Sequence, residues 1–445
     1  MLGIAMRARI SNASTSNVAL GRLVRTLAGG AIILAAALIA GASSAQAQSP
    51  PPPLAPPPPV FQSVDGNGVD LVSGAFNFSS VDVVIGNPGS GGLAYGRSYI
   101  GPGWRDNYVG TINSSGATYT VSVGGSSETF TLASGVFTSV QAQGSTLAFN
   151  SGTGLYTYQS SAGAIAIFDT ALANGMVFDA NVARVTSVTQ PSGEQLSFHY
   201  KTVTVQSVLA RRLQSVTNNL GYQLHFDYSL NSPTLSSQLA AWRTVTNVTG
   251  INNAVDYCDP NADACTGLTQ TWPNASYAIS GYYETVTDTL GRATRYGGVP
   301  AGNGLESVRF PSSSSADHIQ VAYNGSGQVS FVTHGLDTWH YAYADASGAR
   351  TTTVTDPLSN ARVVVSDIAS SQVTSEANEL SQTTSYQYDS NNRVTRVTRP
   401  EGNYTELSYD GRGNVTQTTE VAKSGSGLSN IVTSASYAST CANPV

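Results

Sequence analysis

The chain has 445 residues, of which 11% are charged and 40% are hydrophobic, and its formal net charge is −6. This balance is wrong for a disordered chain, so a packed structure is expected. The acidic balance also argues against a nucleic-acid partner, because non-specific nucleic-acid binding needs a basic surface.

Residues 1–47 have the pattern of an export signal. Four arginines and no acidic residue precede an apolar run over 27–42, and Ala45-Gln46-Ala47 offers the small residues that a signal peptidase requires. An uncleaved anchor is the alternative, but the run is shorter than the roughly 20 residues that span a bilayer. We expect cleavage after Ala47, export to the periplasm, cell surface or medium, and no membrane span in the mature chain. Cleavage removes four of the 21 basic residues, which leaves 17 against 27 acidic residues and a net charge of −10.

A proline-rich linker is predicted over residues 48–60. Its run of prolines favours a stiff polyproline II rod of about 3.1 Å per residue. We interpret it as a spacer between the export signal and the folded body, with a ligand for a proline-binding module as the alternative.

Residues 61–180 contain short segments in which apolar and polar residues alternate, as at 119–123 and 129–132. This period of two is typical of half-buried strands. From residue 48 onward the sequence has no stretch with a strong helical period. The composition therefore predicts an all-β protein, in which 61–180 either forms a domain or begins the sheet.

A repeat is present from residue 184 onward. Its copies span 184–200, 212–228 and 393–409, and each has Gly four residues and Tyr eleven residues after the Thr of a Val-Thr pair. Val245-Thr246 keeps the same two offsets to Gly250 and Tyr257. The offsets predict turn glycines at Gly193, Gly221, Gly250 and Gly402 and packing tyrosines at Tyr200, Tyr228, Tyr257 and Tyr409. Looser copies begin near Thr287, Thr333, Thr355 and Thr374.

Each copy is predicted to form a β-hairpin with one apolar face. In the second copy Leu224, Phe226 and Tyr228 should face the core, while Gln223, His225 and Asp227 face the other way. A single hairpin is marginally stable in water, so the hairpins should stack into one continuous sheet.

Three cysteines follow the export signal. Cys258 and Cys265 flank a short loop and are predicted to form a disulfide, which an exported protein can keep. The alternative is half of a metal site, but no second Cys or His pair lies at ligand spacing. Cys441 is then the odd one out, and its pairing stays open.

The last copies carry Tyr388-Asp389 and Tyr409-Asp410, 21 residues apart, with a Pro-x-Gly turn at Gly402 between them. This pattern resembles the YD repeat of the RHS family, with Asn392 where the family usually has Gly. Asn tolerates a positive φ, so the turn should survive. Residues 69–76 and 97–104 resemble the family's entry segment, and the resemblance extends over 64–108 and 184–420.

The resemblance implies stacked antiparallel hairpins that form a spiralling YD-repeat sheet, part of an RHS-type shell. It divides the chain into an RHS-like β region (61–180), repeats that are first degenerate and then regular (181–435), and a tail (436–445). The implied function is that of an exported, non-catalytic scaffold related to contact-dependent toxin delivery. The implied partners are a C-terminal cargo or the remainder of the shell, and the chain is expected to be shorter than its relatives. A secreted module that binds cell-surface glycan or protein is the alternative.

No catalytic, cofactor-binding or metal-binding residue is predicted, because the sequence has no nucleophile elbow, phosphate-binding loop or His-Glu-x-x-His motif. The best place for a site is the cluster of His334 and His340 with Asp337 and Trp339, which we interpret as the polar face of a hairpin. Arg393, Arg396 and Arg399 cannot share one face of a strand, and we expect them to be solvated or paired.

Overall fold

The computed structural model describes residues 63–100, 103–140, 144–176, 179–299 and 304–437, all within one compact unit of the chain. The predicted export signal, the proline-rich linker and Cys441 lie outside the described residues. The described part is almost entirely β-structure, and none of its helices is long and apolar enough to cross a bilayer.

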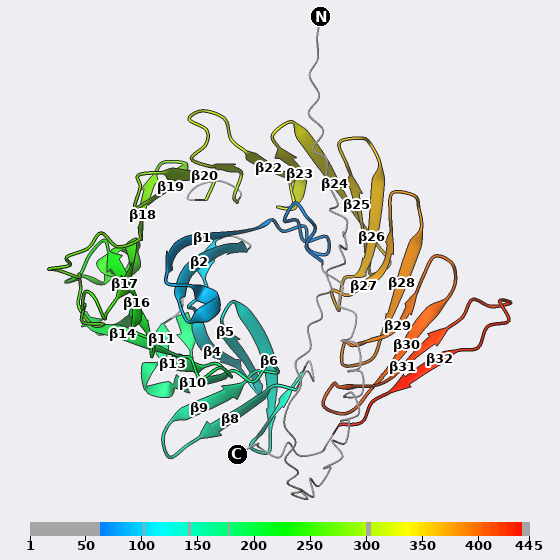
Figure 1. The fold of residues 1–445 in the computed structure, drawn as a ribbon, viewed down its shortest axis with the longest axis horizontal. Coiled ribbons are helices and arrows are strands. Elements are labelled where there is room, and N and C mark those ends of the chain that lie inside the picture. Colours follow the sequence, from blue (N-terminus) through cyan, green and yellow to red (C-terminus); the bar gives the residue numbers. More distant parts are fainter. Residues whose placement is uncertain (1–62, 101–102, 141–143, 177–178, 300–303, 438–445) are drawn as a thin grey trace, which may run out of the picture. The chain divides into compact units, whose positions relative to one another are not determined.

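One long antiparallel sheet runs through the repeats (Figure 1). Each strand from β13 to β32 pairs with the next strand in the sequence, so the predicted stack of hairpins is confirmed. Among the described strands β32 pairs with β31 alone, so the sheet does not close on itself. The strands are β13 (Ala183–Thr189), β14 (Gln195–Val205), β15 (Val208–Asn218), β16 (Tyr222–Tyr228), β17 (Val245–Asn252), β18 (Asn274–Ser280), β19 (Tyr283–Asp288), β20 (Ala293–Gly297), β21 (Ser307–Arg309), β22 (Ile319–Tyr323), β23 (Val329–His334), β24 (Asp337–Ala346), β25 (Ala349–Thr355), β26 (Ala361–Asp367), β27 (Val373–Ala377), β28 (Thr383–Tyr388), β29 (Val394–Thr398), β30 (Tyr404–Tyr409), β31 (Val415–Val421) and β32 (Ile431–Ser434).

The strands that precede the repeats join this sheet at β13, which pairs with both β10 and β4. These strands are β4 (Gly110–Ser115), β5 (Thr118–Val123), β6 (Ser126–Ala133), β7 (Val136–Ser139), β8 (Thr146–Asn150), β9 (Leu155–Gln159) and β10 (Ile165–Asp169). The minor elements are the two-stranded sheet of β11 (Asn174–Met176) and β12 (Asp179–Asn181), the 3-10 turns η1 (Pro88–Ser90), η2 (Thr170–Leu172) and η3 (Ser236–Gln238), and the helix α1 (Leu239–Arg243).

A second, three-stranded sheet lies inside the curve of the long sheet (Figure 1). It consists of β1 (Asn77–Ile85), β2 (Leu93–Ile100) and β3 (Trp104–Asp106). β1 contacts β17 and β18, and β2 contacts β16. The predicted β region therefore has two parts, because the segment up to residue 106 packs on the sheet and the segment from residue 110 belongs to it.

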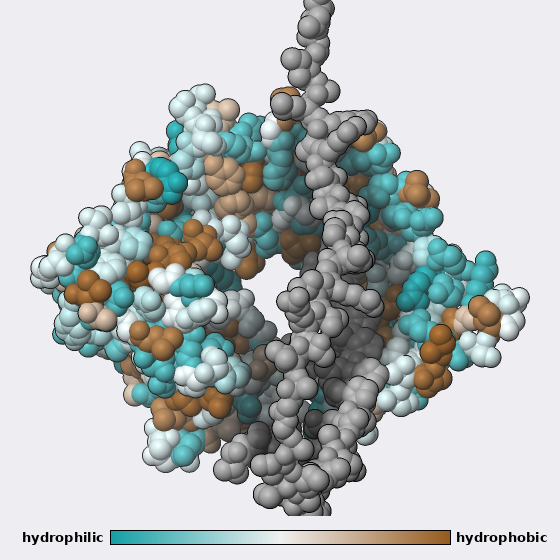
Figure 2. All heavy atoms as spheres, in the orientation of Figure 1, coloured by the Kyte–Doolittle hydropathy of each residue, from teal (hydrophilic) through white to brown (hydrophobic). Residues whose placement is uncertain are grey.

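The main apolar core joins residues of both sheets with residues of the segment that precedes β1. The long sheet contributes one face, here called the inner face, on which strand after strand places a buried apolar residue. Figure 2 shows isolated hydrophobic residues among mostly hydrophilic ones on the surface in view. The inner-face core includes Val216, Leu224, Val248, Val286, Val308, Val332, Val354 and Val364.

Short turns with an Asp or Asn at the first position join many of the hairpins. Asp410 Oδ1 accepts hydrogen bonds from the backbone N–H groups of Arg412 and Asn414, both at 2.9 Å. The residue before Asn414 is Gly413, whose φ of +88° only glycine adopts readily. Asp389 begins an equivalent turn, in which Asn392 has a φ of +63°. The expectation that Asn392 can replace the family's glycine is thus confirmed.

Candidate functional site

The inner face carries a docked N-terminal segment, residues 63–76, which precedes β1 and contacts strands β23–β25. The carboxylate of Asp65 accepts a hydrogen bond of 2.7 Å from the hydroxyl of Tyr341, and the carbonyl of Leu71 accepts one of 2.6 Å from the hydroxyl of Thr352. The carbonyl of Gly74 accepts a backbone hydrogen bond of 2.9 Å from Val329. Leu71 itself is fully buried. The segment is therefore held to the sheet by both main-chain and apolar contacts.

A buried ion cluster joins the inner sheet to the long sheet. Arg97 on β2 lies 2.7 Å from the carboxylate of Asp82 on β1 and 2.6 Å from that of Glu284 on β19. The exposed fractions of these side chains are 7%, 2% and 7%. Burial alone would lower the pKa of Arg97, but the two carboxylates hold it above its usual value. The guanidinium is therefore a fixed charge inside the protein.

Aromatic rings surround the guanidinium of Arg97. Its Cζ lies 4.4 Å from the ring centre of Trp104 and 4.6 Å from that of Tyr277, distances suited to cation–π attraction. The Tyr277 hydroxyl also donates to Asp82 at 3.0 Å, and burial beside that carboxylate raises the pKa of Tyr277. Beside the cluster lies a cavity of about 270 Å³, which Tyr95 and Glu284 also line. The sequence pattern identified residues 97–104 only as a family motif, and it did not indicate that Asp82 and Glu284 pair with Arg97.

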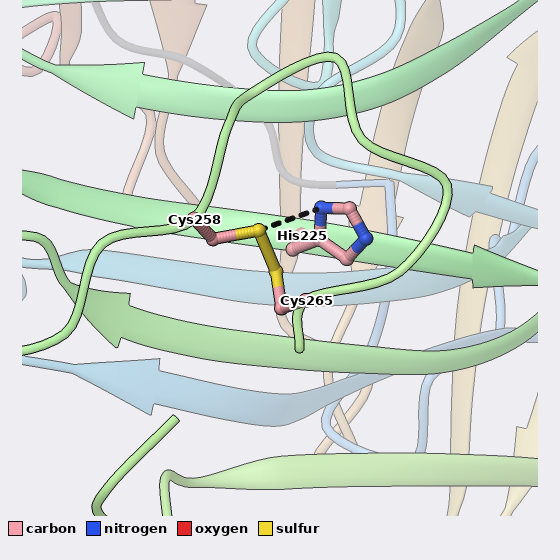
Figure 3. A group of neighbouring side chains, drawn as sticks. All are labelled: His225, Cys258 and Cys265. Carbon is pink, nitrogen blue, oxygen red and sulfur yellow. Dashed lines mark hydrogen bonds between the residues drawn. A yellow bond between two sulfur atoms is a disulfide. The ribbon is translucent and has the colours of Figure 1, made fainter. Parts of the chain in front are cut away.

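Cys258 and Cys265 are joined by a disulfide (Figure 3). It lies on the face of the long sheet that points away from the inner face. The imidazole of His225, on β16, lies against this disulfide, with Nδ1 3.9 Å from Cys258 Sγ. His225 and Cys258 are both buried. The alternation predicts only that Gln223, His225 and Asp227 point away from the apolar face, and the loop 253–273 covers this side of β16 and buries the first two.

The repeat tyrosines occupy equivalent positions in the sheet. A β-bulge falls directly before Tyr200, Tyr228, Tyr388 and Tyr409. The hydroxyls of the last three donate to the carbonyl fifteen residues earlier, which belongs to Leu213, Val373 and Val394 respectively. The arginine that begins a copy stacks on its tyrosine, with Cζ to ring-centre distances of 5.8, 4.0 and 4.7 Å for Arg184 on Tyr200, Arg212 on Tyr228 and Arg393 on Tyr409. These contacts give the repeat tyrosines a packing role in the sheet.

Comparison with protein families gives a match over this region: residues 369–404 and 388–424 match the RHS Repeat family. Residues 369–424 are RHS repeats. The resemblance inferred from Tyr388-Asp389 and Tyr409-Asp410 is thus confirmed. A comparison with curated protein sequences gives no match.

Among solved structures the chain is similar to TcdB2-TccC3, with 12% identity and a TM-score of 0.35 over 81% of this chain and 22% of that chain. It is also similar to the N-terminal domain of the effector protein SpvB from Salmonella typhimurium strain LT2, with 11% identity and a TM-score of 0.24 over 60% of this chain and 95% of that chain. The chain thus spans about 22% of the length of the TcdB2-TccC3 structure.

The turn glycines of the repeat copies lie where the offsets predict in three of four copies. Gly193, Gly221 and Gly402 have φ values of +87°, +88° and +88°. The prediction is wrong for Gly250, which lies within β17, where a Cβ would come within 2.8 Å of Ile85 Cβ. Gly250 is needed for the close approach of β1. Tyr257, predicted to pack, is 71% exposed, because the loop 253–273 replaces the tight turn in this copy.

We expect Gly402→Ala to lower the free energy of unfolding by about 1–2 kcal/mol, the cost of a left-handed backbone for an L-residue. No atom lies within 4 Å of the added Cβ, so the cost is conformational. Gly411→Ala is the matched control, because that site is equally open and its φ is not positive. Urea unfolding of both variants checks this. Equal midpoints for the two would contradict the turn assignment.

The Asp residues of the RHS repeats should make the fold sensitive to acid. Burial alone would raise the pKa of Asp410, but hydrogen bonds from Asn414 and Arg412 hold it below its ordinary value of 3.8. Asp389 is shifted in the same direction, with Arg393 as the donor. A carboxyl with a lowered folded pKa stabilises the fold above the unfolded value and loses that effect as the pH falls through the folded value.

We therefore expect urea midpoints to fall steeply below about pH 3.8, the ordinary Asp value. Asp410→Asn, which keeps the turn's acceptor oxygen, should have a smaller fall over that range. A mutant profile as steep as that of the unchanged protein would show that Asp410 does not contribute.

The predicted polar clusters do not come together as sites. His334 contacts the ring of Trp339, whereas His340 contacts that of Phe331. The three arginines of the last RHS repeats are paired, as Arg393 with Asp389, Arg396 with Glu406 and Arg399 with Glu420. These ion pairs agree with the expectation that the three arginines are solvated or paired.

Proposed function

We propose that this chain is an exported, non-catalytic RHS-type scaffold whose sheet forms part of a shell wall around a C-terminal cargo. The observation that carries the proposal is the continuous ladder from β13 to β32, with RHS repeats at its end and a buried apolar face that runs as far as β27. Export is proposed from the pattern of residues 1–47, and the cargo from the resemblance to RHS proteins.

The N-terminal segment supports a structural role. It contacts strands far along the sheet through Asp65 and Leu71, while Arg97 ties β2 to β19, and we infer that both contacts help to hold the curvature of the wall. The charged groups that are buried here are engaged with one another. This is the arrangement of a brace between two layers.

The test uses the full chain in its own producing cell, with an epitope tag inserted next to Leu358, which is 82% exposed in a turn. The proposal expects the tagged chain outside the cytoplasm, beginning at Gln48. It also expects a larger particle in which a second polypeptide resists trypsin until urea unfolds the scaffold. An isolated monomer in every fraction, or a cytoplasmic chain that retains residues 1–47, would contradict the proposal.

The non-catalytic part is tested separately. Any hydrolytic activity that co-purifies with the chain should be unchanged in His334→Ala and His340→Ala. Loss of the activity in either variant would place a catalytic site in the hairpin of β23 and β24 and overturn this part of the proposal.

A further inference from the structure

We propose that Cys258, Cys265 and His225 form a latent site for one thiophilic divalent ion, such as Zn²⁺, which becomes available when the disulfide is reduced. One ligand atom from each of the three residues lies within 4.8 Å of the others. Figure 3 shows the imidazole directed at the sulfur pair. Two thiolates and one imidazole are the ligands that zinc prefers, and a fourth, open position can hold water.

The carboxylate of Asp227 supports the imidazole of His225 in this role. His225 Nε2 lies 3.5 Å from Asp227 Oδ1, on the side of the ring away from the sulfurs. Nε2 is not hydrogen-bonded to this carboxylate, but the negative charge beside it favours the tautomer with the proton on Nε2 and leaves the lone pair of Nδ1 free for an ion. His225 is 1% exposed, so its ring has little freedom to turn away.

The cysteine loop is anchored by contacts that do not involve the disulfide. Asp256 accepts hydrogen bonds of 2.9 and 2.7 Å from the backbone N–H and the hydroxyl of Thr269, and one of 2.8 Å from the indole N–H of Trp272. In the middle of the loop, the carbonyl of Pro260 accepts a hydrogen bond of 2.7 Å from Ser215 on β15. The two ends and the middle of the loop should therefore stay in place on reduction.

After reduction, the two sulfurs need to move apart only slightly to bind an ion. Zinc–sulfur bonds of about 2.3 Å in a tetrahedron place two sulfurs about 3.8 Å apart. Cys265 is only partly buried and lies in the loop, so it can supply this separation while Cys258 stays against His225.

The chemistry balances with a phosphine as the reductant. The S–S bond breaks, the two sulfurs become thiols with the two hydrogens of one water molecule, and the oxygen of that water oxidises the phosphine to its oxide. The ion then displaces two thiol protons to solvent and forms two metal–sulfur bonds and one bond to Nδ1.

The test is a titration of the purified full chain with Co²⁺, before and after treatment with a water-soluble phosphine. We expect a sulfur-to-cobalt charge-transfer band that saturates at one ion per chain after reduction, no such band in the oxidised protein, and loss of the band on addition of excess Zn²⁺. The Cys441→Ser variant should behave in the same way, because that cysteine is not part of the site.

Variants separate a built site from adventitious thiol binding. Cys265→Ser and His225→Gln should lose most of the band, and Asp227→Asn should weaken binding by about tenfold. His340→Gln, far along the sheet, should leave binding unchanged. No saturating band in a reduced protein with native circular dichroism would overturn the proposal. Loss of the native spectrum on reduction, or full binding by His225→Gln, would overturn it as well.

Discussion

Replacing Arg97 with alanine is expected to lower the free energy of unfolding by about 3–5 kcal/mol, because it leaves two buried carboxylates without a counter-charge. Asp82 and Glu284 have exposed side-chain fractions of 2% and 7%, so water cannot replace the guanidinium. The change also removes the cation that Trp104 and Tyr277 surround. Urea unfolding followed by tryptophan fluorescence measures the effect.

Arg292→Ala is the matched control. Arg292 pairs with Asp288 at 2.7 Å in a hairpin turn, but its side chain is 63% exposed. An exposed pair of this kind contributes about 0–1 kcal/mol. Equal losses in the two variants would show that the Arg97 cluster is hydrated and does not brace the two sheets.

Leu71→Ala should lower the free energy of unfolding by about 2–5 kcal/mol and release the N-terminal segment from the sheet. Leu71 is fully buried and its carbonyl is bonded to Thr352 on β25, so truncation leaves a cavity where the segment meets the sheet. The hydrogen bonds of Asp65 and Gly74 then hold the segment without its apolar anchor. Leu336→Ala, at a side chain that is 100% exposed, is the control and should have no effect.

The release of the segment can be measured separately from global stability. Phe76 is 3% exposed, so chymotrypsin should cleave there slowly in the unchanged protein and much faster in Leu71→Ala. Cleavage at Phe76 that is rapid in both proteins would show that the segment is not docked. A slow rate in both would show that Leu71 is not its anchor.

The hairpins could be predicted from the sequence because the signals that specify them are local. Strand alternation and a Gly at a fixed offset from Val-Thr fall within one copy, and they place Gly193, Gly221 and Gly402 correctly. The same offset fails at Gly250, because β17 continues past the expected turn to Asn252 and the loop 253–273 follows. A fixed offset from the Val-Thr pair cannot predict that one copy has a longer strand and a long loop in place of the turn.

The candidate sites depend on contacts between distant parts of the chain. Arg97 and Glu284 are 187 residues apart, and no periodicity links them. His225 precedes Cys258 by 33 residues, and its alternation places it only on the face away from the apolar residues. Only the loop that covers β16 buries this imidazole against the disulfide. The sequence could therefore predict the cysteine pair but not the third group beside it.

Hydrogen exchange measured by mass spectrometry tests most directly whether the N-terminal strands are docked on the inner face of the sheet. Peptides that cover β1 and β2 should exchange as slowly as those of β15 and β16, because the two sheets share one core. A peptide that covers β32, whose side chains are all exposed, should exchange fast. Exchange of β1 and β2 as fast as that of β32 would contradict the account, because the inner face would then lack its docked segment.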